Sequence, residues 1–158
     1  MDVQKMIDAL NKSLSLEYAA VIQYYQHGFL LQGAEREYMT GFFRDKSKGT
    51  LETHVKRLGD KIVALGGVPT VEPATIRQAA DVKEMLRQAV ELEREAQAAH
   101  HNALKLVAES DKPEEIALRF MLEGLVEDEQ RDIDALELVL GSKQPAITAK
   151  EVRLKQSS

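Results

Sequence analysis

Apolar side chains recur every three or four residues along four long segments of this chain. This spacing matches the helical period of about 3.6 residues and accounts for nearly the whole sequence. No stretch of strand length alternates apolar and polar residues between hairpin turns. The pattern therefore predicts an all-α fold with helices at residues 3–32, 36–65, 81–109 and 113–140. With 158 residues, the chain has the size of one domain built around one core.

The segment at residues 66–80 decides how the helices connect, because it is rich in glycine, proline and short polar residues. Its extended length is about 50 Å, whereas a helix of about 29 residues is about 43 Å long. The segment can therefore cross the whole bundle, which leaves the second and third helices parallel. We expect a four-helix bundle with one long crossover over residues 1–141, followed by a polar tail at 142–158.

Each predicted helix carries an acidic or imidazole side chain near the middle of its apolar stripe. One such glutamate alone would more often reach water at the stripe edge, and one such histidine would more often be a hydrogen-bonded core residue. Because helix midpoints meet at one height in a bundle, these side chains should converge. They are Glu17, His54, Glu93, Glu129 and Asp132. Four carboxylates held together without a cation would repel one another, so the pattern predicts a bound divalent metal.

The amino-acid composition limits which metals the protein can bind and which classes of partner it can have. The chain has no cysteine, so any ligands are oxygen and imidazole, which suit iron or manganese and would accept zinc. Its net charge of −5 argues against nucleic-acid binding, which depends on a basic surface. No apolar run approaches the roughly 20 residues that span a bilayer, and the N-terminus lacks a signal-peptide pattern. We therefore expect a cytoplasmic protein without a membrane partner.

Several short stretches of the chain together resemble one known family. They are Leu10-Asn11-Lys12 with Glu17, Gln23-Tyr24-Tyr25 with His27, His54 with Leu65-Gly66-Gly67-Val68-Pro69, Asp81-Val82-Lys83-Glu84-Met85-Leu86-Arg87, and Glu127-Asp128-Glu129 with Ile133-Asp134-Ala135-Leu136-Glu137. Over residues 3–141 they resemble the bacterioferritins, within the ferritin-like diiron carboxylate proteins. The resemblance implies a ferritin-like bundle that packs as dimers, often within larger hollow shells, and oxidises ferrous iron inside each bundle.

The resemblance also implies a metal site with a glutamate on the first and third helices and a Glu-x-x-His pair on the second and fourth. Four of its six ligands match this chain, namely Glu17, His54, Glu93 and Glu129. Leu51 replaces a bridging glutamate, and Asp132 replaces the last histidine. We expect Leu51 to put methyl groups where an anion would stand, which weakens the site for a second metal.

Residues close to the expected ligands are not expected to bind metal or haem themselves. Glu52 stands where bacterioferritins have a methionine that ligates haem, and a carboxylate is a poor axial ligand, so we expect no haem. His100 lies two turns beyond Glu93, about 10 Å along the axis, and is expected to be a core or supporting residue rather than a ligand. Tyr24 and Tyr25 are expected to pack.

Three functions remain open. The first is iron binding in iron oxidation, storage or homeostasis, including ferroxidase activity at a modified dinuclear site. The second is an assembly protein that has lost metal chemistry, and the third is a diiron oxidoreductase acting on peroxide or an organic substrate. The first is favoured because a metal-free bundle would gain stability by replacing its buried charges. We also expect homo-oligomers, because apolar residues lie off the central stripes. These are Leu16, Ile22, Phe29, Leu30 and Phe42.

Overall fold

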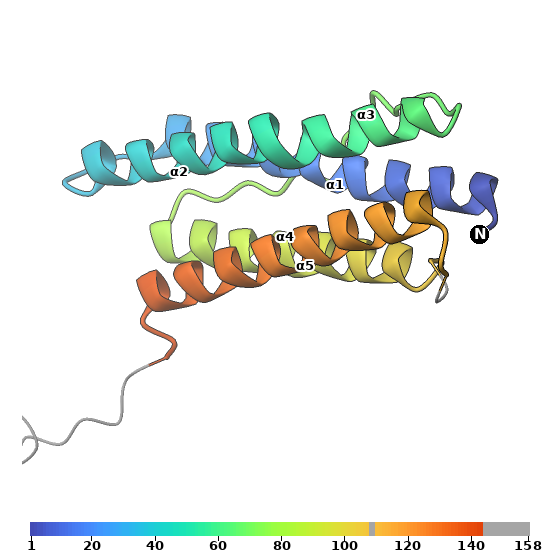
Figure 1. The fold of residues 1–158 in the computed structure, drawn as a ribbon. Helices are drawn as coiled ribbons and strands as arrows, with labels where there is room; N and C mark the ends of the chain where they lie inside the picture. Colours follow the sequence, from blue (N-terminus) through green and yellow to red (C-terminus); the bar gives the residue numbers. More distant parts are fainter. Residues whose placement is uncertain (108–109, 144–158) are drawn as a thin grey trace, which may run out of the picture.

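The computed structural model describes residues 1–107 and 110–143. Its elements follow one another along the chain (Figure 1). They are α1 (Val3–Leu30), α2 (Arg36–Thr50), the π-helical turn η1 (Leu51–Val55), α3 (Lys56–Ala64), α4 (Val82–Leu104) and α5 (Pro113–Leu140). Because α2, η1 and α3 are continuous, they make one bundle helix, and the predicted four helices are confirmed. The third ends at Leu104 rather than at 109. Residues 144–158 of the predicted tail lie outside the described residues.

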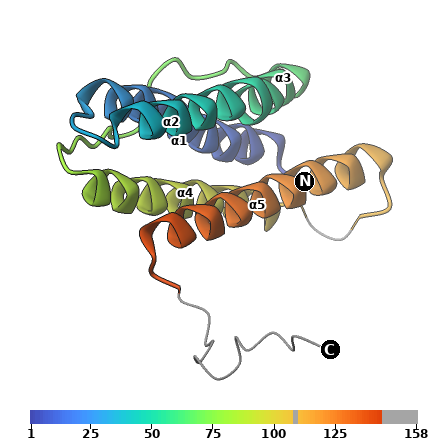
Figure 2. The same cartoon turned by 90° about the vertical axis from the view of Figure 1, so that its left-hand side faces the viewer.

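The helices form two layers, one of α1 with α2 and α3, the other of α4 with α5 (Figure 2). The chain returns along the bundle between α3 and α4, so that α2, α3 and α4 run in the same direction (Figure 1). This arrangement confirms the predicted bundle with one long crossover. Within the described residues, none of the helices is both long and apolar enough to cross a membrane.

The crossover is held along α1 by side chains of that helix. The Asn11 side chain donates a hydrogen bond to the Val68 carbonyl at 3.1 Å and accepts one from the Thr70 backbone N–H at 2.7 Å. Further along α1, the Gln23 side chain accepts from the Arg77 backbone N–H at 2.8 Å. These bonds satisfy backbone groups that have no helix or sheet partner, which is why an irregular segment can lie against the bundle.

Local sequence signals set the helix ends. The side chain of Asp81 accepts a hydrogen bond from the Glu84 backbone N–H at 3.0 Å and so caps the N-terminus of α4. Helix α5 begins at Pro113 and ends at Leu140, and the C-cap residue Gly141 has a φ of +70°, which favours glycine. The N-cap of α5 is Lys112, whose side chain makes no capping hydrogen bond.

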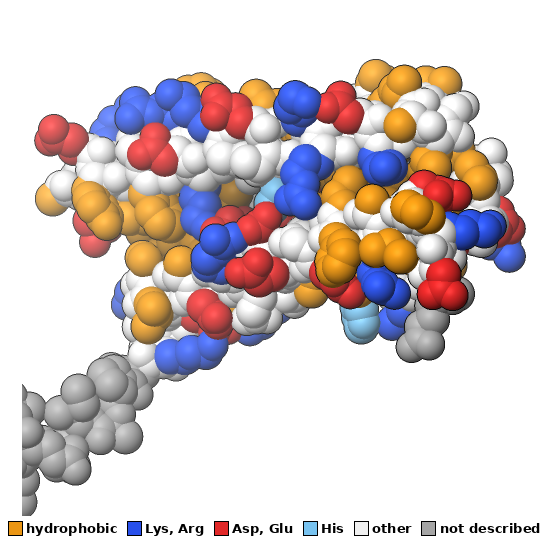
Figure 3. Space-filling view, in the orientation of Figure 1, with side chains coloured by type: hydrophobic (Ala, Val, Ile, Leu, Met, Phe, Trp, Pro, Cys, Tyr) orange, Lys and Arg blue, Asp and Glu red, His pale blue; other side chains and the backbone are white. Residues whose placement is uncertain are grey.

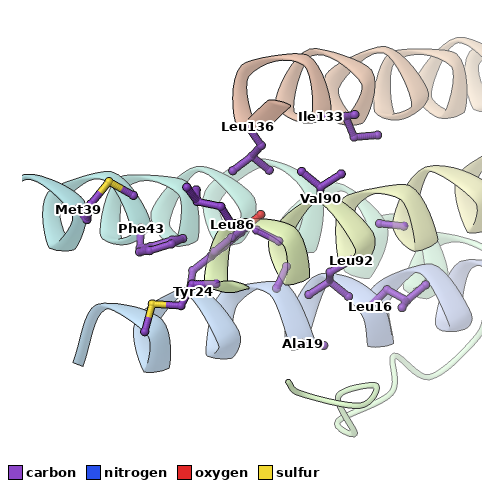
Figure 4. Packing of buried hydrophobic residues seen from close by; sticks show 14 of the residues in the cluster. Leu16, Ala19, Tyr24, Met39, Phe43, Leu86, Val90, Leu92, Ile133 and Leu136 are labelled. Carbon is purple, nitrogen blue, oxygen red and sulfur yellow. The ribbon is translucent and has the colours of Figure 1, made fainter. Parts of the chain in front are cut away.

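The buried apolar residues form two clusters. The first packs the second half of α1 against α2, α4 and the end of α5 (Figure 4). Its labelled members are Leu16, Ala19, Tyr24, Met39, Phe43, Leu86, Val90, Leu92, Ile133 and Leu136. The second cluster lies near the start of α1. Its members are Met6, Ile7, Leu10, Leu14, Leu58, Ile62, Ala103, Val107, Leu118, Leu122 and Leu125. Each bundle helix therefore contributes residues to both clusters. The boundary between the clusters lies near the middle of each helix and is occupied by buried polar side chains.

The apolar residues expected on the outside divide into two groups. Leu16 is buried and Phe42 packs against the first cluster, so these two belong to the core rather than to the surface. Ile22, Phe29 and Leu30 are exposed, with Phe29 the most exposed of them at 69%.

Candidate metal centre

Four buried side chains meet between the two clusters, one from each bundle helix. They are Glu17 of α1, His54 of η1, His100 of α4 and Glu129 of α5. Each offers a ligand atom within 4.8 Å of those of the other three, and none of the residues is more than 6% exposed. We refer to these four residues as the centre.

Carboxylates and imidazoles face one another within the centre. The Nε2 atom of His100 lies 2.8 Å from Glu17 Oε1 and 3.5 Å from Glu129 Oε1. The Nδ1 atom of His54 lies 2.9 Å from Glu129 Oε1 and 3.4 Å from Glu17 Oε2. Each ring thus contacts both carboxylates, and the four side chains surround one point.

Glu129 is incompletely satisfied by these contacts. Both of its carboxylate oxygens are buried and lack a partner with hydrogen-bond geometry, although the His54 ring is at ion-pair distance. Leaving a buried charged group without such a partner costs free energy, which a ligand at this point would recover. Two carboxylates with two imidazole nitrogens, free of sulfur, are a donor set that suits divalent iron, manganese or zinc. The residues present therefore fit a metal.

The charges of the centre compensate one another without a metal. Burial opposes protonation of His54, but the carboxylates of Glu129 and Glu17 outweigh it and raise the pKa of His54 to about 10. The pKa of His100 is raised for the same reasons. Burial alone would raise the pKa of Glu129, yet the adjacent His100 and His54 rings lower it. The metal-free centre therefore favours a protonated His54 beside ionised carboxylate, and a metal must displace this proton.

Glu93 lies beside the centre rather than inside it. It is buried on α4, and the Tyr24 hydroxyl donates a hydrogen bond to its Oε1 atom. Burial and the negative charge of Glu129 raise the pKa of Glu93 well above its usual range. Burial and the Glu93 charge likewise raise the pKa of Tyr24. Tyr24, which was expected to pack, therefore also has a polar role.

The structure does not bring Asp132 into the core. Its side chain is 32% exposed and forms an ion pair with the ammonium group of Lys46 on α2. Asp132 follows Glu129 by three residues, which rotates it about 60° around the helix and carries it about 4.5 Å along the axis. This position at the edge of α5, together with a short side chain, directs the carboxylate toward Lys46.

The expectation for Leu51 is wrong. Its side chain is 47% exposed and does not occupy the centre. The π-helical turn widens the helix here to more than four residues per turn, so that the buried position one turn before His54 is Thr50. Glu52 is also exposed, on the outer side of the same turn.

His100 belongs to the centre, although the sequence predicted a core or supporting residue rather than a ligand. The antiparallel α1 and α4 pair Glu17 with His100 and, seven residues later in α1 and seven residues earlier in α4, Tyr24 with Glu93. Glu17 is therefore level with His100, not with Glu93. The available signal was the place of His100 on the same apolar stripe as Glu93, since residues seven apart share one face.

A pocket of about 480 Å³ lies between α2 with η1 and α5, and of the four residues of the centre only His54 lines it. The Nε2 atom of His54 lies 3.6 Å from Oδ2 of Asp128, which lines the pocket as well. Lys46 and Asp132 line its wall. Figure 3 shows acidic and basic side chains along this seam, with a histidine visible among them. Because His54 faces the centre through Nδ1 and the pocket through Nε2, it connects the two.

Comparison with known proteins identifies relatives of this chain. The family model of the ferritin-like domain matches residues 7–143. The bacterioferritin of Brucella melitensis biotype 1 is 31% identical over 139 residues, which cover 86% of this chain and 83% of the relative. A nutrient stress-induced DNA-binding protein of Synechococcus sp. is 35% identical over 74 residues, 47% of this chain, and this match spans only 42% of that relative.

A solved structure agrees with the sequence relatives. It is that of a ferritin-like diiron-carboxylate protein from Bacillus anthracis str. Ames, with a TM-score of 0.81 and 31% identity over 89% of this chain and 98% of that one. The topology of the bundle, the family model and the relatives all indicate the same family. The chain, with its buried cluster of glutamate and histidine residues, belongs to the ferritin-like family.

Proposed function

We propose that the protein binds divalent iron at Glu17, His54, His100 and Glu129 and acts in iron oxidation, storage or homeostasis. The observation that carries this proposal is the Glu129 carboxylate, fully buried between two histidines with neither oxygen satisfied. Manganese and zinc are the other ions suited to these donors. We place this activity in the cytoplasm, as the sequence-based expectation has it.

The carboxylates and the imidazoles of the centre contribute to metal binding in different ways. Glu17 and Glu129 supply the negative charge that attracts a cation, and the two imidazoles supply neutral nitrogen ligands once their protons have left. The pocket at His54 offers a route from the surface. Iron bound here would supply the ferrous–ferric chemistry of a ferroxidase.

Anaerobic calorimetry tests the proposal on protein treated with a chelator and then titrated with ferrous iron or manganese. The native protein should bind, and Glu129→Gln should bind far more weakly because the substitution removes one anionic ligand. Glu127→Gln is the matched control, because Glu127 is exposed on the same helix. If the native protein binds neither metal, the metal reading fails and the assembly-protein reading takes its place. Ferrous oxidation followed by absorbance then distinguishes a ferroxidase from a binding protein, and peroxide consumption tests the diiron oxidoreductase.

We further propose that the protein forms homo-oligomers, as a dimer or a larger shell. The supporting observation is the exposed apolar group of Ile22, Phe29 and Leu30 on α1. Light scattering should show a mass above that of the monomer at micromolar concentration, and Phe29→Glu should reduce it. A native monomer would refute the proposal. We do not extend DNA binding to this chain, because its net charge is −5.

A further inference from the structure

We propose that the ammonium group of Lys46 stands in for a second cation beside the centre, so that each chain holds one metal ion. This inference rests on the proposed function, because it concerns how many metals the same site takes. Three observations support it: the shape of the centre, the partners of the carboxylates next to it, and the position of Lys46.

The first observation is that the centre encloses a single point. All four of its residues offer ligand atoms within 4.8 Å of one another, and each of the four comes from a different helix. Four protein ligands around one point complete the coordination of a tetrahedral ion. The centre therefore accommodates one ion without help from any other side chain.

The second observation is that Glu93 and Asp132, the two predicted ligands outside the centre, already have partners. The Tyr24 hydroxyl donates to Glu93, and the Lys46 ammonium pairs with Asp132. Asp132 and Lys46 line the same pocket as His54, which places this ion pair next to the centre. The two carboxylates are the groups that a second metal would need, and one of them is neutralised by a lysine.

The third observation is the way in which Lys46 reaches Asp132. Its side chain starts on α2, lies along the wall of the pocket and is only 15% exposed. A lysine ammonium carries its charge on a single compact group, so it resembles a metal cation in size and sign more closely than a guanidinium does. An incoming second ion would have to displace this ammonium from Asp132 and would be repelled by it.

The test counts manganese ions bound per chain under anaerobic conditions. The native protein should bind about one, and Lys46→Met should bind about two, because the methionine keeps the apolar stem and removes the charge. Lys48→Met is the matched control, since Lys48 is exposed on the same helix, and it should bind about one. Lys46→Arg should also bind about one, because the positive charge remains. Adding Asp132→Asn to Lys46→Met should return the count from two to one.

The outcomes separate this inference from the proposed function. No binding by the native protein refutes the proposed function. A native count of two, or a count of one in Lys46→Met, refutes the role of Lys46 while the proposed function stands. Circular dichroism establishes that each variant is folded, and Lys46→Gln replaces Lys46→Met if the latter does not fold.

Discussion

The metal-free protein should lose stability as the pH rises above neutrality, because its centre is held together by protonated histidine. The pKa of His54 is 6.5 in the unfolded reference and about 10 in the folded chain. A group with a raised folded pKa contributes fully below pH 6.5, and its contribution disappears as the pH rises through about 10. Between these values the folded state binds one more proton at His54 than the unfolded state. Each pH unit then removes about 1.4 kcal/mol from the free energy of unfolding.

From pH 7 to pH 9 the loss from His54 alone is about 2.5 kcal/mol, because at pH 7 a part of the unfolded chains also binds this proton. The raised pKa of His100 adds to it in the same direction. Urea unfolding followed by circular dichroism, on chelator-treated protein at pH 7, 8 and 9, measures the slope. In His54→Gln the slope should be shallower, whereas His101→Gln, at an exposed position on α4, should keep the native slope.

A native free energy of unfolding that stays constant or rises from pH 7 to pH 9 would refute this reasoning. Equal slopes in the native protein and in His54→Gln would show that the pH dependence has another source. In either case the centre would not be held by a protonated His54.

Four further predictions concern the crossover, helix α3 and the metal. In Gly67→Ala the new Cβ would lie 2.7 Å from the Ile7 side chain, so urea unfolding should show a loss of about 1–3 kcal/mol from overpacking. Gly59→Ala, in an open helical position of α3, should instead gain about 0.5–1 kcal/mol. Asn11→Ala removes both hydrogen bonds to the crossover and should cost about 1–3 kcal/mol in the same assay. Metal binding should release protons from His54, which calorimetry in buffers of different ionisation enthalpy counts, and affinity should rise about tenfold per pH unit for each proton displaced.

The helices and their connection were predictable because one physical property determines both. Burial of apolar side chains imposes the helical period on the sequence, and the glycine- and proline-rich stretch at residues 66–80 interrupts it. The length of that stretch then fixes the direction of α4. Aspartate is favoured just before a helix and glycine just after one, and Asp81 and Gly141 occupy these positions in the structure.

The composition of the centre was less predictable, because it depends on how far each helix slides along its neighbours. Periodicity reports which face of a helix is buried and says nothing of its axial position. The expectation that helix midpoints meet placed Glu93 level with Glu17, whereas packing places His100 there. Asp132 could not be assigned from its own helix either, since its partner Lys46 lies on α2.

The π-helical turn η1 lets the buried faces of α2 and α3, the two halves of the second bundle helix, point toward the same core. In an unbroken α-helix, Ile62 of the second cluster would lie about 140° around the axis from Met39 of the first. One residue absorbed by the wider turn reduces this angle to about 40°, so both side chains can face the same core. Deleting one exposed residue of the turn would thus leave a continuous helix whose two ends point in different directions. The extra residue sets the rotation of α3 relative to α2 about the helix axis. Its presence therefore matters for the layer, whereas the identity of its side chain does not.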